Sequence, residues 1–270
     1  MANWTRCRSL IVGTGIAALS HTAAAQTDYY NTDAGRPIRT EDAYPVERRA
    51  FELQLAPLRL ERAPGGTYTW GLEPEAAFGI LPRTHVEVGF PLALIDGSAG
   101  RSTAGLAGLE LSMLHNLNVE TSIPALAVVA DVLLPAGAFG PDKAYPSLKG
   151  IATKTFSWVR FHVNGQYTIG DAPTVGASNA VHLSRWSAGF AADKTFPLRS
   201  LLATAEIVSE QPVDDAEPLE WSAATGARYQ LSPRWAVDGG VGLRLSGDSR
   251  PWFVTIGSAY AFGLPWYPRR

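Results

Sequence analysis

The sequence has a single cysteine, little charge and no long apolar run beyond its first 25 residues. Only 18% of its 270 residues are charged and the net charge is −2, whereas 46% are apolar. This composition excludes a disordered tail, and it lacks the basic surplus of a nucleic-acid-binding protein. One cysteine excludes a small disulfide-linked domain. After the first segment, no run of about 20 apolar residues is available to cross a bilayer as a helix.

The first 25 residues have the order of a cleavable secretory signal peptide. Arg6 and Arg8 precede an apolar core, Leu10–Leu19, and the small residues Ala23–Ala25 follow it. Such a core is too short to anchor a chain in a membrane; a buried N-terminal helix is the alternative interpretation. Cys7 precedes the core, whereas a lipid-modified cysteine would follow it, so a lipoprotein is not expected. Cleavage removes two Arg and no acid, which changes the net charge from −2 to −4.

Four segments are expected along the chain. Polar residues together with Gly35, Pro37 and Pro45 predict an extended periplasmic lead-in before the first strand. The expected boundaries are a signal peptide at 1–25, the lead-in at 26–46, a barrel at 47–263 and a C-terminal extension at 264–270.

Apolar and polar residues alternate with a period of two through most of the chain after residue 50. In one run, Phe161, Val163 and Tyr167 alternate with polar residues that include Arg160 and His162. This pattern predicts strands with one apolar and one polar face. The turn signals between such runs predict roughly twelve strands, with short connections at one end and mostly longer connections, richer in Gly, Pro and Asp, at the other.

This arrangement predicts an all-β fold, a transmembrane antiparallel up-and-down β-barrel of the outer membrane. Hydrocarbon offers no partner to unpaired backbone groups, so a sheet that crosses it must close on itself. A β-sandwich or barrel outside the membrane is the alternative, because its strands alternate too. Aromatic residues near the expected strand ends favour the membrane barrel, since they suit the two bilayer boundaries. They are Trp70, Phe78, Phe156, Trp158, Trp186, Phe196, Trp221, Trp235, Trp252, Tyr260 and Phe262.

The last expected strand also supports a membrane barrel. Thr255, Gly257, Tyr260 and Phe262 have a spacing that resembles the C-terminal signal for barrel insertion, although residues 263–270 extend past its usual end.

The polar face of each strand is expected to line the lumen of this barrel. Charges of both signs occur there, which predicts a narrow pore, or one crossed by salt bridges and plugged by the lead-in. The charges either select solutes or only pair to hold the barrel rigid. The expected lumen residues are Glu73, Glu75, His85, Glu87, Glu110, Lys149, Arg160, His162, Asn164, Gln166, Arg185, Asp193, Glu206, Arg228, Arg234, Asp238 and Arg244.

The lead-in also carries a family resemblance. The run from Gly35 to Ala43, GRPIRTEDA, is followed within ten residues by Phe51–Gln54 at the start of the first strand. It resembles the opening of the outer-membrane barrels grouped as "MetA-pathway of phenol degradation" proteins. The resemblance implies a transport-type pore for aromatic or other small hydrophobic compounds, and it transfers no catalytic residue.

Other site interpretations are weaker. His182 and Ser184 share a strand face and give one alternative, a lipid hydrolase; a structural or adhesive barrel is another. His85 and Glu87 lack a third metal ligand, and an acidic loop from Glu210 to Glu220 is expected to be solvated. We therefore expect a passive small-molecule channel of the outer membrane without enzyme activity, cofactor, metal or nucleic acid. Its expected partners are outer-membrane lipid and lipopolysaccharide, a small-molecule solute and the barrel-insertion machinery.

Overall fold

The computed structural model describes six ranges of the chain. They are residues 30–62, 68–96, 102–173, 183–214, 216–246 and 251–263. The expected signal peptide and C-terminal extension lie outside the described residues. Within the described ranges, no helix has both the length and the apolar character needed to cross a membrane.

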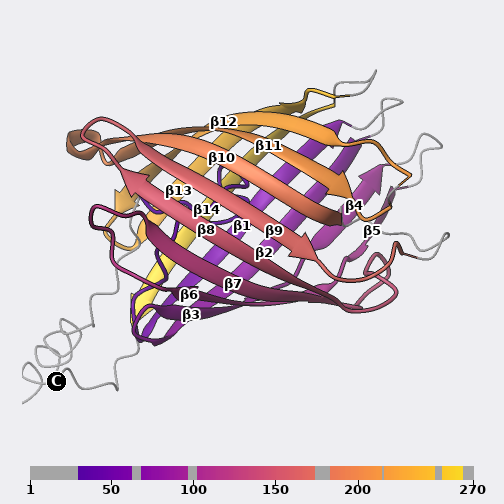
Figure 1. The fold of residues 1–270 in the computed structure, drawn as a ribbon. Coiled ribbons are helices and arrows are strands. Elements are labelled where there is room, and N and C mark those ends of the chain that lie inside the picture. Colours follow the sequence, from indigo (N-terminus) through magenta and orange to yellow (C-terminus); the bar gives the residue numbers. More distant parts are fainter. Residues whose placement is uncertain are drawn as a thin grey trace, which may run out of the picture.

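The regular secondary structure of the described chain consists of β-strands and one short 3₁₀ turn (Figure 1). Their bounds are β1 (Ala50–Arg62), β2 (Tyr68–Leu81), β3 (Thr84–Gly89), β4 (Leu92–Asp96), β5 (Ser102–Leu106), β6 (Leu109–Asn116), β7 (Ala125–Leu134), β8 (Tyr145–Thr155), β9 (Arg160–Thr168), β10 (Ser184–Phe196), β11 (Leu201–Pro212), β12 (Glu220–Ser232), β13 (Trp235–Arg244) and β14 (Trp252–Gly263). A single 3₁₀ turn among the described residues, Pro197–Arg199, joins β10 to β11.

The strands form one antiparallel sheet that closes on itself, because β1 pairs with both β14 and β2. Strands β3 and β4 both pair with β2, while β6 pairs with β3 and β5 pairs with β4. Strands β3 and β4 are therefore one strand with a short interruption, and so are strands β5 and β6. Pro91 has no N–H for the ladder, and Gly108 has a φ of 135°, which accounts locally for the breaks. The prediction of an all-β barrel of about twelve strands is confirmed.

The connections differ between the two ends of the barrel. Tight turns such as Pro82–Arg83 join the strands at one end, here called the short-turn end. The connection after β6 is longer than expected, because it spans 117–124. Asn118 holds it by donating to the Pro124 carbonyl at 2.8 Å and accepting from the Leu126 amide at 2.9 Å. The opposite, long-loop end faces right in Figure 1.

The outer surface of the barrel is apolar and the inner surface is polar. On β9, Val163 and Tyr167 are 52% and 53% exposed, whereas Arg160 and His162 are 8% and 0% exposed. A packed sandwich would bury the apolar face instead, so that alternative is wrong. Exposed tryptophans flank the apolar wall, for example Trp221 near the long-loop end and Trp235 at the short-turn end. This exterior suits a bilayer with aromatic residues at both boundaries.

Candidate functional site: the barrel lumen

Residues 30–46, here called the inner segment, lie inside the barrel. They are the described part of the lead-in that the sequence predicted to be extended and periplasmic. The segment begins beside the short-turn end, where the Tyr30 carbonyl accepts a hydrogen bond from Arg160. It turns at Asp33–Arg36 and comes back to the same end, where Arg48 pairs with Gly79 of β2. The chain therefore enters and leaves the lumen on one side.

The stretch that follows this turn, at Arg39 and Thr40, is held by two carboxylates of β11. Glu206 accepts hydrogen bonds from the amides of Arg39 and Thr40 at 2.9 and 2.8 Å, and from the Thr40 hydroxyl at 2.8 Å. The Arg39 guanidinium donates to both carboxylate oxygens of Glu210, at 2.7 and 2.8 Å. Paired charge-assisted bonds of this kind fix orientation as well as position.

Neutral side chains of the wall bind the main chain of the returning limb. Asn164 accepts from the Glu41 amide and donates to the Glu41 carbonyl, both at 2.9 Å. Thr153 accepts from the Ala43 amide at 3.0 Å, and Asn116 donates to the Ala43 carbonyl at 2.8 Å. These side chains supply the partners that an extended chain would otherwise find in a neighbouring strand.

Two ion pairs join the turn of the inner segment to β12 and β13. Arg36 donates to one oxygen of Asp238 from Nε at 3.2 Å and from Nη2 at 3.0 Å, and neither side chain is exposed. Arg228 reaches Asp33 at 2.6 Å. Removing one partner of such a pair leaves an uncompensated buried charge, which is strongly destabilising.

A third group of charges lies near the short-turn end. Arg160 of β9 binds Asp193 of β10 at 2.7 Å, and it also lies 3.6 Å from Asp42 of the inner segment. His162 shares the same carboxylate, with 2.8 Å between its Nε2 and Asp193. Asp193 thus holds the Arg160 guanidinium in a position where it faces Asp42 of the inner segment.

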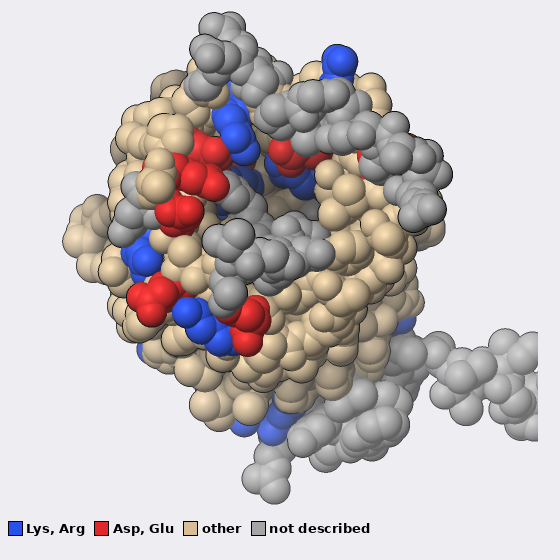
Figure 2. All heavy atoms as spheres, turned by 90° about the vertical axis from the view of Figure 1, so that its right-hand side faces the viewer, with Lys and Arg blue, Asp and Glu red and all other residues tan. Residues whose placement is uncertain are grey.

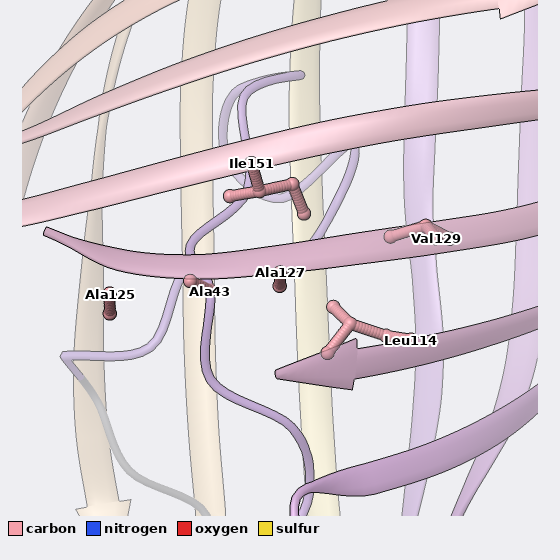
Figure 3. Packing of buried hydrophobic residues seen from close by; sticks show 6 residues of the cluster. All are labelled: Ala43, Leu114, Ala125, Ala127, Val129 and Ile151. Atoms are coloured by element: carbon pink, nitrogen blue, oxygen red, sulfur yellow. The ribbon is translucent and has the colours of Figure 1, made fainter. Parts of the chain in front are cut away.

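A small apolar contact completes the packing of the inner segment. Figure 3 shows Ala43 seated against side chains that β6, β7 and β8 direct inward. They are Leu114, Ala125, Ala127, Val129 and Ile151. Because Ala43 is fully buried, water is excluded from this side of the segment.

A hydrogen bond to the 117–124 turn ties the segment to the short-turn end. The Tyr44 hydroxyl donates to Glu120 at 3.1 Å, and Glu120 also accepts from the Thr155 amide at 2.8 Å. Desolvation raises the pKa of Glu120, but hydrogen bonds from Thr155, Lys154 and Tyr44 outweigh it and lower the pKa below its ordinary value. Glu120 therefore stays ionised at neutral pH and keeps these bonds.

Most of the expected lumen residues occupy inward positions of the strands. Three lie at the ends of the barrel instead of along its middle. Arg185 donates to the Gly170 and Val213 carbonyls near the long-loop end, Arg244 binds Glu220 at 2.7 Å there, and Arg234 lies in the turn between β12 and β13. The inward positions of the rest are those of Glu73, Glu75, His85, Glu87, Glu110, Lys149, Arg160, His162, Asn164, Gln166, Asp193, Glu206, Arg228 and Asp238.

Several residues that face the lumen were not predicted from the sequence. Alternation alone identifies Glu52, which lies between Phe51 and Leu53, and Asp131 in β7. Asn116 and Thr153 carry no comparable signal, because small polar residues also occur on turns and outer faces. Their role depends on the segment that lies against them.

Two further sequence hypotheses concerned a hydrolase at His182 and Ser184 and a metal site at His85 and Glu87. His182 lies outside the described residues, and the Ser184 hydroxyl donates to Glu210 at 2.5 Å. Nδ1 of His85 accepts from the Val46 amide at 3.0 Å, and no group of three or more metal-ligating side chains occurs in the described ranges.

The residues of the expected insertion signal divide between the two faces of β14. Thr255 is buried and faces the inner segment, with its hydroxyl 3.3 Å from the Pro37 carbonyl, and Gly257 lies beside Asp238. Tyr260 and Phe262 lie on the outer face, where Phe262 stacks on Phe51 with ring centroids 5.4 Å apart.

The long-loop end is hollowed. Figure 2 shows Lys, Arg, Asp and Glu side chains within and around this hollow, while the outer wall seen from this end is mostly uncharged. Charges of both signs therefore face the bore.

The fit between wall and segment gives a direct prediction at Gly189 of β10. A Cβ atom there would lie 2.7 Å from the Thr40 hydroxyl, but 3.7 Å from its nearest wall neighbour, Val208. Gly189→Val will displace the inner segment without breaking a wall contact, and we expect ionic conductance through the barrel to rise. Gly165→Val on β9 is the control, because nothing lies within 4 Å of a Cβ at Gly165. Equal conductance in both variants would contradict the prediction.

A closed antiparallel barrel with an apolar exterior and a polar bore is the architecture of outer-membrane β-barrel proteins. No family model matches the chain, and no curated protein matches it. Among solved structures, it is similar to the COG4313 outer membrane channel from Pseudomonas putida F1, with a TM-score of 0.56 and 14% identity over 86% of this chain and 100% of that one. It is also similar to the KdgM porin, with a TM-score of 0.50 and 12% identity over 79% of this chain and 99% of that one. These likenesses show the fold.

Proposed function

We propose that this protein is an outer-membrane channel through which small molecules pass passively. The observation that carries the proposal is a bore lined with charged and polar side chains inside a closed, apolar-surfaced wall, narrowed by an internal segment. A structural or adhesive barrel is the alternative, and it would carry no solute through the bore. The two similar solved structures, a channel and a porin, support the same function.

The finer parts of the proposal rest on the sequence. Residues 1–25 direct export and are cleaved, and residues 47–263 enter the outer membrane with the help of the barrel-insertion machinery. The solute is a small aromatic or hydrophobic compound on the strength of the lead-in resemblance. We assign no catalytic role, since the Ser184 hydroxyl is bonded to Glu210.

Single-channel recording in planar bilayers tests the proposal. We expect discrete conductance steps well below those of open sixteen-stranded porins, because a barrel of about twelve strands encloses less space and part of it is filled. Heat-modifiable migration on gels verifies that the barrel is folded. The absence of any ion or solute flux through a folded barrel would defeat the proposal.

A further inference from the structure

A cavity of about 50 Å³ lies between the inner segment and one side of the barrel wall. Strands β2, β3, β6 and β7 each contribute one carboxylate to it, and β8 contributes a lysine. These wall residues are Glu75, Glu87, Glu110, Asp131 and Lys149.

The sheet register crowds these carboxylates together. Gly89 of β3 pairs with Glu75 on one side and Glu110 on the other. A Cβ atom at Gly89 would lie 3.4 Å from both neighbouring side chains, so the two glutamates border the position of the glycine. Glu87 faces the same cavity two residues earlier in β3. Like charges that face one small cavity repel each other where water is scarce.

Cations elsewhere in the lumen are engaged with other acids. Arg36 binds Asp238, and Arg228 binds Asp33. Lys149 lies at the cavity but binds Glu41 of the inner segment at 3.3 Å. In the part of the chain that the structure describes, none of the four wall carboxylates forms an ion pair with Lys or Arg. The nearest contacts are His85, 3.7 Å from Glu87, and the Ser147 hydroxyl on Asp131.

Two polar atoms of the inner segment at this cavity have no hydrogen-bond partner. Thr32 is 2% exposed and its hydroxyl is unpaired; Glu41 is 9% exposed and its Oε1 is unpaired. Both residues line the cavity. An unsatisfied buried polar group costs about 1–3 kcal/mol, so a molecule that donates hydrogen bonds here is favoured. This observation is independent of the charge on the wall.

We propose that this cavity binds one small ammonium-type cation. The four carboxylates supply the negative potential, while Glu41 Oε1 and the Thr32 hydroxyl accept its N–H groups. The described residues hold no group of three side chains close enough to coordinate a metal ion. A volume of about 50 Å³ admits a few water molecules or one methylammonium ion.

The test is equilibrium binding of radiolabelled methylammonium to the folded barrel in neutral detergent, at about pH 9 and low ionic strength. At this pH crowded carboxyl groups are ionised and methylammonium still keeps its proton. We expect saturable binding of one ion per chain. The double variant Glu87→Gln/Glu110→Gln keeps side-chain size, removes two charges and will weaken binding about tenfold or more. Glu217→Gln, which removes an exposed loop charge, will bind like the unaltered protein. Tetramethylammonium, which is larger and has no N–H, will compete poorly.

Each outcome decides the proposal. No saturable binding, equal binding by the double variant, or equal losses in the double variant and Glu217→Gln would overturn it. The single variants Glu87→Gln and Glu110→Gln give the same comparison if the double variant fails the heat-modifiability check. The site does not depend on the channel proposal: methylammonium binding in a barrel without conductance would support the site and contradict the channel.

Discussion

Deletion of residues 30–45 will raise the single-channel conductance several-fold. The inner segment lies folded back within the bore and contacts wall side chains from β3 around to β14. The wall itself is closed by its own backbone ladder, since β1 pairs with β14 without help from the segment. The deletion therefore exchanges a protein plug for water and leaves the barrel closed.

A matched variant separates the role of the segment from that of chain length. Replacing residues 30–45 with an equally long Gly/Ser sequence removes the side chains that bind the wall, so it should conduct nearly as well as the deletion. Both variants are checked for heat-modifiable migration. Unchanged conductance in a folded deletion variant would mean that the inner segment does not limit flux.

The second large effect is expected at the Arg36–Asp238 pair. Arg36→Ala leaves the buried Asp238 without the partner that binds it, and Asp238→Ala leaves Arg36 with only the longer contact to Asp33, at 3.6 Å. Each single loss costs about 3–5 kcal/mol, whereas removing both charges costs less than the two single losses combined. Because the ladder of β13 persists, the loss falls on docking of the inner segment. A loss of about 3 kcal/mol raises the population of undocked segment roughly 100-fold.

Cysteine labelling measures that population. In a chain expressed without residues 1–25, and therefore without Cys7, Ala43→Cys introduces a single thiol at a fully buried position of the segment. The maleimide labelling rate should rise by about two orders of magnitude in each single variant and by less in the double variant. Equal rates in all backgrounds, or losses that simply add, would refute the coupling between Arg36 and Asp238.

The sequence predicted the wall of the barrel well because lipid imposes a simple rule on it. Every strand must turn apolar residues outward, so Phe161, Val163 and Tyr167 alternate visibly with Arg160 and His162. The sequence did not predict where strands are interrupted or how long each connection is. The interruptions at Pro91 and Gly108 and the long connection after β6 are local features that the alternation of apolar and polar residues does not predict.

The site was only partly predictable for a different reason. Inward-facing charges such as Glu87 and Asp238 follow from alternation, but their partners do not. Arg36 and Asp238 are 202 residues apart, and Arg39 and Glu210 are 171 apart. No local pattern records which residue lies opposite another across a bore.

The sequence by itself determined that a closed barrel forms, which faces of its strands are apolar, and that the polar face carries charges of both signs. Only the tertiary structure decided that residues 30–46 fold into the bore, which arginine meets which carboxylate, and which four carboxylates stay without a Lys or Arg partner among the described residues. The reason is physical: the hydrocarbon acts on every wall residue separately, whereas charge pairing depends on distances that exist only after the sheet has closed.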